Sequence, residues 1–295
     1  MRNLPELVED FLRYLKVQRG RTTLTVRNYR LYLKRFLSWS YNASLGQAAD
    51  ITREKLRDYR LWLAHQRSLG GTTLSPATQN YHLTALRSFV NYLKQKNIES
   101  LPAKNIALNP YLKRRLTILS ENEMAALLQA VWQSHEPEIV KIRDEAMIKL
   151  IIVSGLKVSE LAALTRRHLD LENKLLTITR FGLSQNFPLP PELITTINNY
   201  LYHRQDKGQA LFIRHDRAAK PTDIKRLTPR SVQRSLERYR KLAGLKQKVT
   251  PHTLRHSFAF QLAQSGADLT TLQKSLGLKH RATAHVYKRP NQSQG

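Results

Sequence analysis

The 295-residue sequence contains no cysteine, and this absence removes three classes of function. A chain without thiols has no disulfide framework, no cysteine-ligated zinc and no cysteine nucleophile. It also lacks any apolar run near the roughly 18 residues of a membrane span. The N-terminal stretch MRNLPELVED carries acid where a signal peptide carries base. We therefore expect a cytoplasmic protein with no membrane partner.

Acidic side chains are scarce. The sequence holds 49 Lys and Arg against 22 Asp and Glu, a formal net charge of +27, while its hydrophobic fraction of 41% is ordinary for a globular protein. Such a surplus needs a polyanionic partner. Residues 1–110 hold 18 basic and 7 acidic side chains, and the remainder holds 31 and 15, so the surplus extends over the whole chain. We expect the partner to be double-stranded DNA.

Residues 1–100 are predicted to form a domain of four helices. Apolar residues recur at helical spacing in four segments, which lie at 7–15, at 23–39, from 52 onward and from 75 onward. The Gly70-Gly71 pair separates the third segment from the fourth. Residues 101–117 contain two prolines, no apolar period and a basic run, and are predicted to be a linker.

Residues 118–295 are predicted to form a second, mixed domain. A capping-box pattern at 120–123 opens one helix, and an apolar helix runs from about 139 to 153. Between 175 and 189 the apolar period changes to two, which indicates a β-hairpin with its turn in 182–186. Helices return from 191 onward. The predicted fold class is therefore mainly α with a small β-sheet.

The segment TPHTLRH at 250–256 is the sharpest local signal. Thr250 is an expected N-cap, and His252 and Arg255 then share one face of the first helical turn. A helix N-terminus favours anions, and an arginine beside a histidine there suits a phosphate. A solvated basic helix start explains the same spacing, and the residues alone leave both interpretations open.

Several motifs occur together and in order. They are SGLKVSEL (154–161), TPRSVQ (228–233), PHTLRHSFA (251–259) and Leu276-Gly277 followed by Tyr287, preceded by TVRNYRLYL (25–33) and the stretch 75–89. Together they resemble the tyrosine recombinases of the phage integrase family, most closely the Xer-type branch. This resemblance covers nearly the whole chain.

The resemblance implies a fold and an activity. Residues 1–100 would be a SAM-like, DNA-clamping domain and 118–295 the catalytic-type domain. The activity would be site-specific DNA recombination through a 3′-phosphotyrosyl intermediate, without metal or cofactor, in a homo- or hetero-tetramer on two DNA sites. In this family a tyrosine attacks the scissile phosphate, two arginines with a histidine or tryptophan hold its oxygens, and a hairpin lysine protonates the departing 5′-oxygen.

The family pattern transfers to this chain residue by residue. Tyr287 falls at the nucleophile, and His252 and Arg255 match the His-x-x-Arg motif. Lys157 occupies the position of the first arginine, and Arg180 that of the hairpin lysine. Two further matches are Glu160, expected to orient the first arginine position, and His256, expected to be structural.

Some of these positions depart from the family pattern. Lys157 lacks the planar grip of an arginine, and Arg180 gives up a proton poorly. The histidine or tryptophan expected after Gly277 is Leu278; His280 is either its substitute or a solvated turn residue. Eight residues follow Tyr287, where relatives usually extend a docking helix.

Three functional classes therefore stay open at the level of the sequence. The first is a site-specific recombinase. The second is a DNA-binding, catalytically impaired homologue that acts as an architectural or regulatory subunit. A weaker third is an enzyme that relaxes DNA in the manner of type IB topoisomerases.

Overall fold

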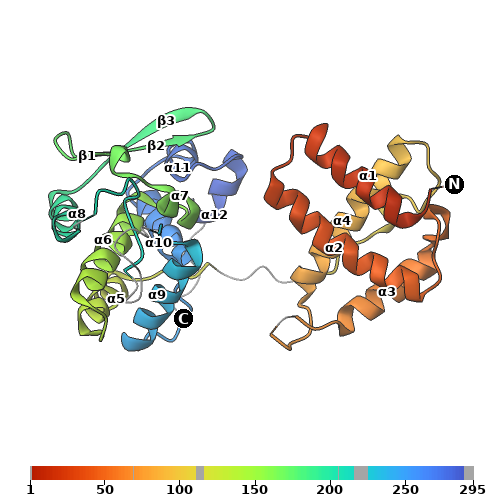
Figure 1. Ribbon diagram of the computed structural model, residues 1–295, viewed down its shortest axis with the longest axis horizontal. Helices are drawn as coiled ribbons and strands as arrows, with labels where there is room; N and C mark the ends of the chain where they lie inside the picture. Colours follow the sequence, from red (N-terminus) through yellow and green to blue (C-terminus); the bar gives the residue numbers. More distant parts are fainter. Residues whose placement is uncertain (1, 69, 111–115, 205, 216–224, 289–295) are drawn as a thin grey trace. The chain divides into compact units, whose positions relative to one another are not determined.

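The computed structural model describes residues 2–68, 70–110, 116–204, 206–215 and 225–288. The chain forms two compact units, Met1–Arg114 and Arg115–Gly295 (Figure 1). Each unit has its own hydrophobic core. The mainly helical fold with a small sheet that the sequence predicts is confirmed. Within the described residues, no helix is both long and apolar enough to cross a membrane.

The first unit contains four long helices, as the apolar spacing predicts. They are α1 (Leu4–Val17), α2 (Thr23–Asn42), α3 (Arg53–His65) and α4 (Pro76–Gln95). Short 3₁₀ turns, η1 (Ala48–Asp50) and η2 (Ala103–Asn105), complete the unit. Its mostly aliphatic core includes contacts between aromatic rings: the Phe11 and Phe89 rings are 5.7 Å apart, and the Phe36 ring meets Tyr59 edge-on at 5.2 Å. Such pairs add to the stability that burial alone provides.

The predicted linker, 101–117, begins with residues that pack onto the first unit. Leu101 and Ile106 are buried in its core, and the Arg87 guanidinium on α4 donates to the Ile106 carbonyl. Residues 111–115 of that segment lie outside the described residues.

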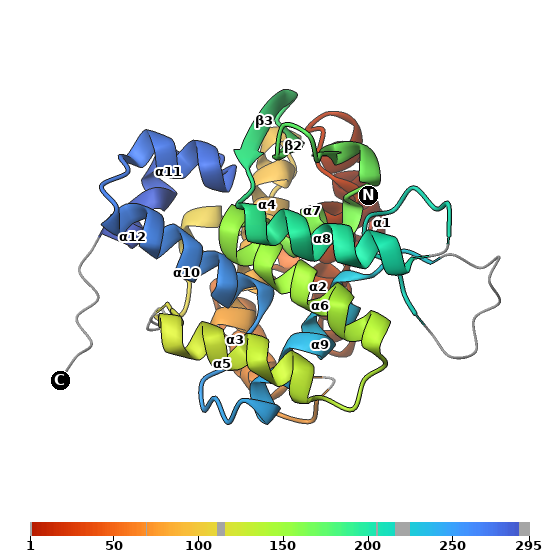
Figure 2. The same cartoon turned by 90° about the vertical axis from the view of Figure 1, so that its left-hand side faces the viewer.

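The second unit is built around α6 (Glu138–Ser154), which packs against α8 (Pro191–His203) and α10 (Pro251–Gln264) (Figure 2). The other helices of this unit are α5 (Glu121–Gln133), α7 (Val158–Ala163), α9 (Pro229–Leu242), α11 (Leu269–Leu276) and α12 (His285–Lys288), with 3₁₀ turns η3 (Arg166–His168) and η4 (Arg281–Ala284). Met147, Ile148 and Ile151 of α6 are fully buried, because helices cover several of its faces.

The sheet has three antiparallel strands in the order β1 (Leu169–Asp170), β2 (Leu175–Arg180), β3 (Leu183–Pro188). Arg180 pairs with Leu183, so the turn consists of Phe181 and Gly182 alone. The predicted turn in 182–186 is therefore wrong, and strand β1 was not predicted. Both turn residues have positive φ, 53° and 78°, as a two-residue type I′ hairpin requires. The sequence does not indicate this turn, because phenylalanine is an unusual residue at a turn position with positive φ.

Candidate active site

The start of α10 places three of the motif residues. Thr250 caps the helix by accepting from the Thr253 backbone N–H, and Pro251 occupies the first turn. From this fixed start, His252 points into solvent, Arg255 is buried at 5% exposure and His256 is half-buried. The sequence predicted the cap and the shared face of His252 and Arg255.

Arg255 is held by two backbone carbonyls. Its guanidinium donates to the Gly155 carbonyl at 2.6 Å and to the Leu276 carbonyl. Gly155 ends α6 with a φ of +59°, and a Cβ there would lie 2.2 Å from the Phe258 ring, so only glycine fits. Burial lowers the pKa of Arg255, and the Glu160 carboxylate opposes this shift. Two of the five guanidinium N–H groups are used, which leaves others for an anion.

Tyr287 lies on α12 with its hydroxyl against α10. The hydroxyl oxygen is 2.8 Å from Nδ1 of His256, and the two ring centroids are 5.7 Å apart. Tyr287 is buried at 7% exposure. Burial raises the pKa of the phenol, while the Arg255 charge acts in the opposite direction. The structure thus brings Tyr287, Arg255 and His256 together.

His256 is the residue whose contact the sequence did not anticipate, because it was expected to be structural. Burial lowers its pKa to about 4, and the neighbouring His252 and Arg255 act in the same direction. His256 is therefore uncharged near pH 7, and in the tautomer with its proton on Nε2 it accepts from the Tyr287 hydroxyl. Its spacing of four residues from His252 was the available signal, since it places both rings on one face of α10.

Lys157 is the N-cap residue of α7 and reaches the same region. Its ammonium donates to the Gly277 carbonyl at 3.2 Å and lies 3.8 Å from a Glu160 carboxylate oxygen. The side chain is 41% exposed. Burial lowers the pKa of Lys157, Glu160 opposes this, and the charges of Arg255 and Arg180 add to the lowering. Lys157 and Arg255 thus bind the carbonyls of two consecutive residues, Gly277 and Leu276.

The Arg180 side chain, at the end of β2, is buried and almost fully hydrogen-bonded within the protein. Its guanidinium makes a two-pronged ion pair with Glu160, with distances of 2.9 and 2.7 Å. A further nitrogen donates to the Ser275 carbonyl at 2.6 Å and to the Gln185 side chain at 3.3 Å. The side chain is only 5% exposed, and it lies over the Phe187 ring. The sequence placed Arg180 near this site but did not indicate that it would be enclosed.

Glu160 links the two basic residues. Besides binding Arg180, its carboxylate accepts from the Lys157 backbone N–H at 2.8 Å and so caps α7. Burial alone would raise the pKa of Glu160, but the hydrogen bonds from Arg180 and from the Lys157 backbone bring it below its ordinary value. Glu160 was expected to orient the side chain at position 157. The side chain to which its carboxylate is hydrogen-bonded is instead that of Arg180.

Gly277 permits this close packing. It ends α11 with a φ of +55°, and a Cβ there would lie 2.5 Å from Cδ of Arg180. The neighbouring Leu278 packs, half-buried, against the apolar cluster that includes Tyr287. His280 is exposed and has no hydrogen-bond partner among the described side chains. Neither residue places an imidazole beside Arg255.

A basic groove of about 950 Å³ adjoins the start of α10. It is lined by Arg230, Gln233, Arg234, Glu237, Arg240, Lys246, Lys248, Val249 and Thr250. The Arg240 guanidinium is bound to Glu237 at 2.9 Å, whereas Arg230 and Lys248 have no ion-pair partner among the described residues. Unpaired cations beside a helix N-terminus suit the phosphates of a nucleic-acid backbone.

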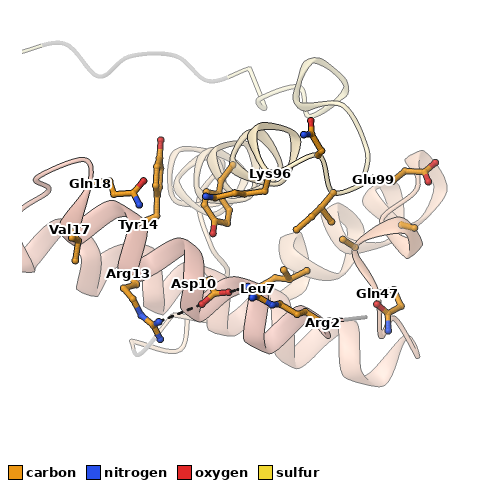
Figure 3. Close-up of a pocket in the computed structure, with 15 residues that line it drawn as sticks. Arg2, Leu7, Asp10, Arg13, Tyr14, Val17, Gln18, Gln47, Lys96 and Glu99 are labelled. Carbon is orange, nitrogen blue, oxygen red and sulfur yellow. Dashed lines mark hydrogen bonds and ion pairs between the residues drawn. The ribbon is translucent and has the colours of Figure 1, made fainter.

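The first unit carries a second groove of about 980 Å³, between α1, η1 and the end of α4 (Figure 3). Its charges are largely paired: Arg2 and Asp10 are 2.5 Å apart, and Arg13 lies 3.9 Å from the same carboxylate. The lining holds no histidine. We therefore place the candidate active site in the second unit. No group of three or more metal-binding side chains occurs within the part of the chain that the structure describes.

Comparisons with known proteins agree with this geometry. Residues 117–294 match the phage integrase family, and residues 8–97 match the phage integrase N-terminal SAM-like domain. Tyrosine recombinase XerA of Pyrococcus furiosus is 32% identical over 286 residues, which cover 96% of this chain and 89% of XerA. Tyrosine recombinase XerD of Lacticaseibacillus casei is 31% identical over 294 residues, which cover 95% of this chain and 92% of XerD.

Two solved structures share the fold. The XerH site-specific recombinase bound to its difH substrate, in a pre-cleavage complex, aligns with a TM-score of 0.71 at 23% identity, over 97% of this chain and 81% of XerH. A lambda integrase dimer bound to a COC′ core site aligns with a TM-score of 0.74 at 17% identity, over 99% of this chain and 79% of that chain.

Proposed function

The chain belongs to the phage integrase family and is a site-specific tyrosine recombinase that acts on DNA, and we propose that Tyr287 is its nucleophile. The observation that carries this proposal is the Tyr287 hydroxyl, 2.8 Å from the uncharged His256 and within the field of Arg255. A base and a fixed cation beside a tyrosine hydroxyl are the groups that phosphoryl transfer to tyrosine requires.

In the cleavage step the Tyr287 oxygen attacks the scissile phosphorus as its proton passes to Nδ1 of His256. Arg255, oriented by the Gly155 and Leu276 carbonyls, binds the non-bridging oxygens as charge develops on them. The exposed His252, on the same helix, supplies a further donor. The bond to the 5′-oxygen breaks, which leaves a 3′-phosphotyrosine and a free 5′-hydroxyl. The reverse attack by another strand's 5′-hydroxyl completes the exchange.

Both units contribute to DNA binding in this proposal. The second unit offers the basic groove beside α10, and the first offers the exposed Arg27, Arg30 and Lys34 along α2. A net charge of +27 distributed over both halves suits a chain that holds one duplex with two domains. The assignments of 1–100 as the clamping domain, 101–117 as the linker and 118–295 as the catalytic domain are part of this proposal.

The number of protein chains in the recombining complex follows from the number of DNA strands that are cut. Complete exchange between two duplexes breaks four strands, and each break consumes one tyrosine. We therefore expect a tetramer on two DNA sites, homo- or heteromeric, in a cytoplasmic setting where DNA is accessible.

The test of the proposed recombinase activity begins by identifying the DNA sequence to which the chain binds. DNA fragments selected by the purified full-length chain from a random duplex library would be sequenced, and two copies of the selected site would be placed on one plasmid. The expected result is inversion or deletion of the DNA between the sites, detected by amplification across the new junctions. Tight, site-specific binding without recombined junctions would favour a non-catalytic DNA-binding subunit.

A further inference from the structure

We propose that Lys157 donates the proton to the departing 5′-oxygen and that Arg180, which occupies the position expected of the donor, is a structural residue. This inference rests on the proposed function, because it names the acid of the same cleavage step. It rests on three observations: how Arg180 is bound, how far Lys157 is exposed, and which carbonyls Lys157 and Arg255 bind.

Arg180 has almost no donor capacity left for DNA. Of its five N–H groups, two are directed to Glu160, one to Ser275 and one to Gln185. With its side chain only 5% exposed, it could reach a phosphate only by breaking its two-pronged ion pair with Glu160. A guanidinium is also a poor acid, because it keeps its proton in proteins.

Lys157 has the opposite properties. Its ammonium carries three N–H donors, of which one bonds the Gly277 carbonyl, and its side chain is 41% exposed. The lowered pKa of Lys157, caused by burial and partly opposed by Glu160, makes the ammonium a better acid than a free lysine.

The position of Lys157 matches that role. Arg255 binds the Leu276 carbonyl and Lys157 binds the next one, that of Gly277, so the two cations are bound to the carbonyls of adjacent residues. A phosphate held by Arg255 would therefore lie near the lysine, and its departing oxygen is assigned to the lysine side. Lysine at 157 then supplies the acid that arginine at 180 does not, so these departures from the family pattern do not remove the acid from the site.

The proton balance of the step is complete. The Tyr287 proton goes to His256, the new O–P bond forms, and the P–O5′ bond breaks with its electron pair on the 5′-oxygen. Lys157 transfers one proton to that oxygen, which yields a neutral amine and a 5′-hydroxyl. In the reverse step the amine takes the proton back.

The experiment varies the leaving group. Two nicked duplexes of the selected site would differ in one atom, a 5′-bridging oxygen or sulfur at the scissile phosphate, because a thiolate leaves without a proton. Full-length Lys157→Gln should form the covalent adduct about 10²- to 10³-fold more slowly than the parent on the oxygen substrate and within about threefold of it on sulfur. Lys149→Gln, which removes a partly exposed lysine paired with Glu145 in the same unit, is the matched control and should change neither rate.

Arg180→Lys separates the two candidate donors. If Arg180 is structural, this variant leaves the ratio of the oxygen and sulfur rates unchanged. A higher ratio of the oxygen rate to the sulfur rate in Arg180→Lys would overturn the inference. So would an equal loss of rate on both substrates in Lys157→Gln. Neither result would affect the assignment of Tyr287 as nucleophile. Absence of any adduct from the parent on either substrate would instead contradict the proposed function itself.

Discussion

The Tyr287 hydroxyl oxygen lies 2.8 Å from Nδ1 of His256, and this contact joins α12 to α10 through two groups that can exchange a proton. The pKa of His256 is lowered to about 4 by burial, so the imidazole is in its basic form near pH 7. A tyrosine whose own pKa is raised by burial needs such a neighbour to lose its proton.

The first prediction concerns the pH dependence of cleavage. Because the pKa of His256 is depressed, its basic form persists as the pH falls, and the parent's rate of adduct formation should not drop between pH 7.5 and 5.5 through this group. The charged or titratable groups that face His256 are His252, Arg255 and Tyr287. In His256→Gln the rate should fall about 10²-fold at pH 7 and rise with pH toward the pKa of the phenol.

The measurement is single-turnover adduct formation at a series of pH values. His280→Gln, which alters an exposed histidine, is the control and should follow the parent's profile. A His256→Gln profile parallel to that of the parent would show that His256 takes no proton from Tyr287.

The second prediction concerns the ion pair between Arg180 and Glu160. Glu160→Gln leaves a buried guanidinium without its counter-charge, and we expect the free energy of unfolding of the second unit to fall by about 3–5 kcal/mol. Glu145→Gln removes the partner of Lys149 in a more exposed i,i+4 pair and should cost less than about 1 kcal/mol. Urea unfolding of the full chain, followed by circular dichroism, measures both; equal losses would contradict the structural role of Arg180.

The third prediction concerns Gly277. In Gly277→Ala the new methyl would meet Cδ of Arg180 at 2.5 Å, on a backbone that already has a φ of +55°. Gly244→Ala has a similar φ of +66° but nothing within 4 Å, so it carries the backbone strain without the clash. We expect Gly244→Ala to cost about 1 kcal/mol and Gly277→Ala at least about 1 kcal/mol more, with slower cleavage. Matching thermal unfolding curves for the two variants would show that Arg180 does not depend on this contact.

The fourth prediction concerns the basic groove. Arg230→Ala and Lys248→Ala each remove a cation that has no ion-pair partner among the described residues. Each should therefore lower the slope of log affinity against log salt concentration by about 1, as loss of one phosphate contact does. Lys149→Ala removes a paired cation and should leave the slope unchanged. Fluorescence anisotropy on a labelled duplex at several salt concentrations gives the slopes, and unchanged slopes for both groove variants would place the DNA elsewhere.

Local signals explain which parts of the fold could be predicted. The cap at Thr250, the capping box at Ser120 and the glycine end of α6 are each encoded within a few neighbouring residues, and the helices that they bound form as expected. The turn at Phe181 and Gly182 was misplaced because Phe181 adopts a positive φ, which its residue type does not indicate.

The site was predictable to the extent that its residues lie in motifs. His252 and Arg255 share one helical turn, and the family pattern supplied Tyr287. The contacts that decide their chemistry join residues far apart in the sequence: Arg180 to Glu160, Lys157 to Gly277 and His256 to Tyr287. No spacing rule indicates that Arg180 would be enclosed and Lys157 exposed, because both side chains are held by carbonyls at the end of α11, 95 and 120 residues away in the sequence.

The most direct test of the account is covalent capture by Tyr287. On a nicked duplex of the selected site the cut strand diffuses away, so the parent should accumulate a protein–DNA adduct that survives denaturant. Tyr287→Phe should bind the same duplex with unchanged affinity and form no adduct, whereas Tyr202→Phe, which alters a tyrosine with 86% exposure, should match the parent. An adduct that persists in Tyr287→Phe would show that another residue attacks the phosphate and would contradict the account.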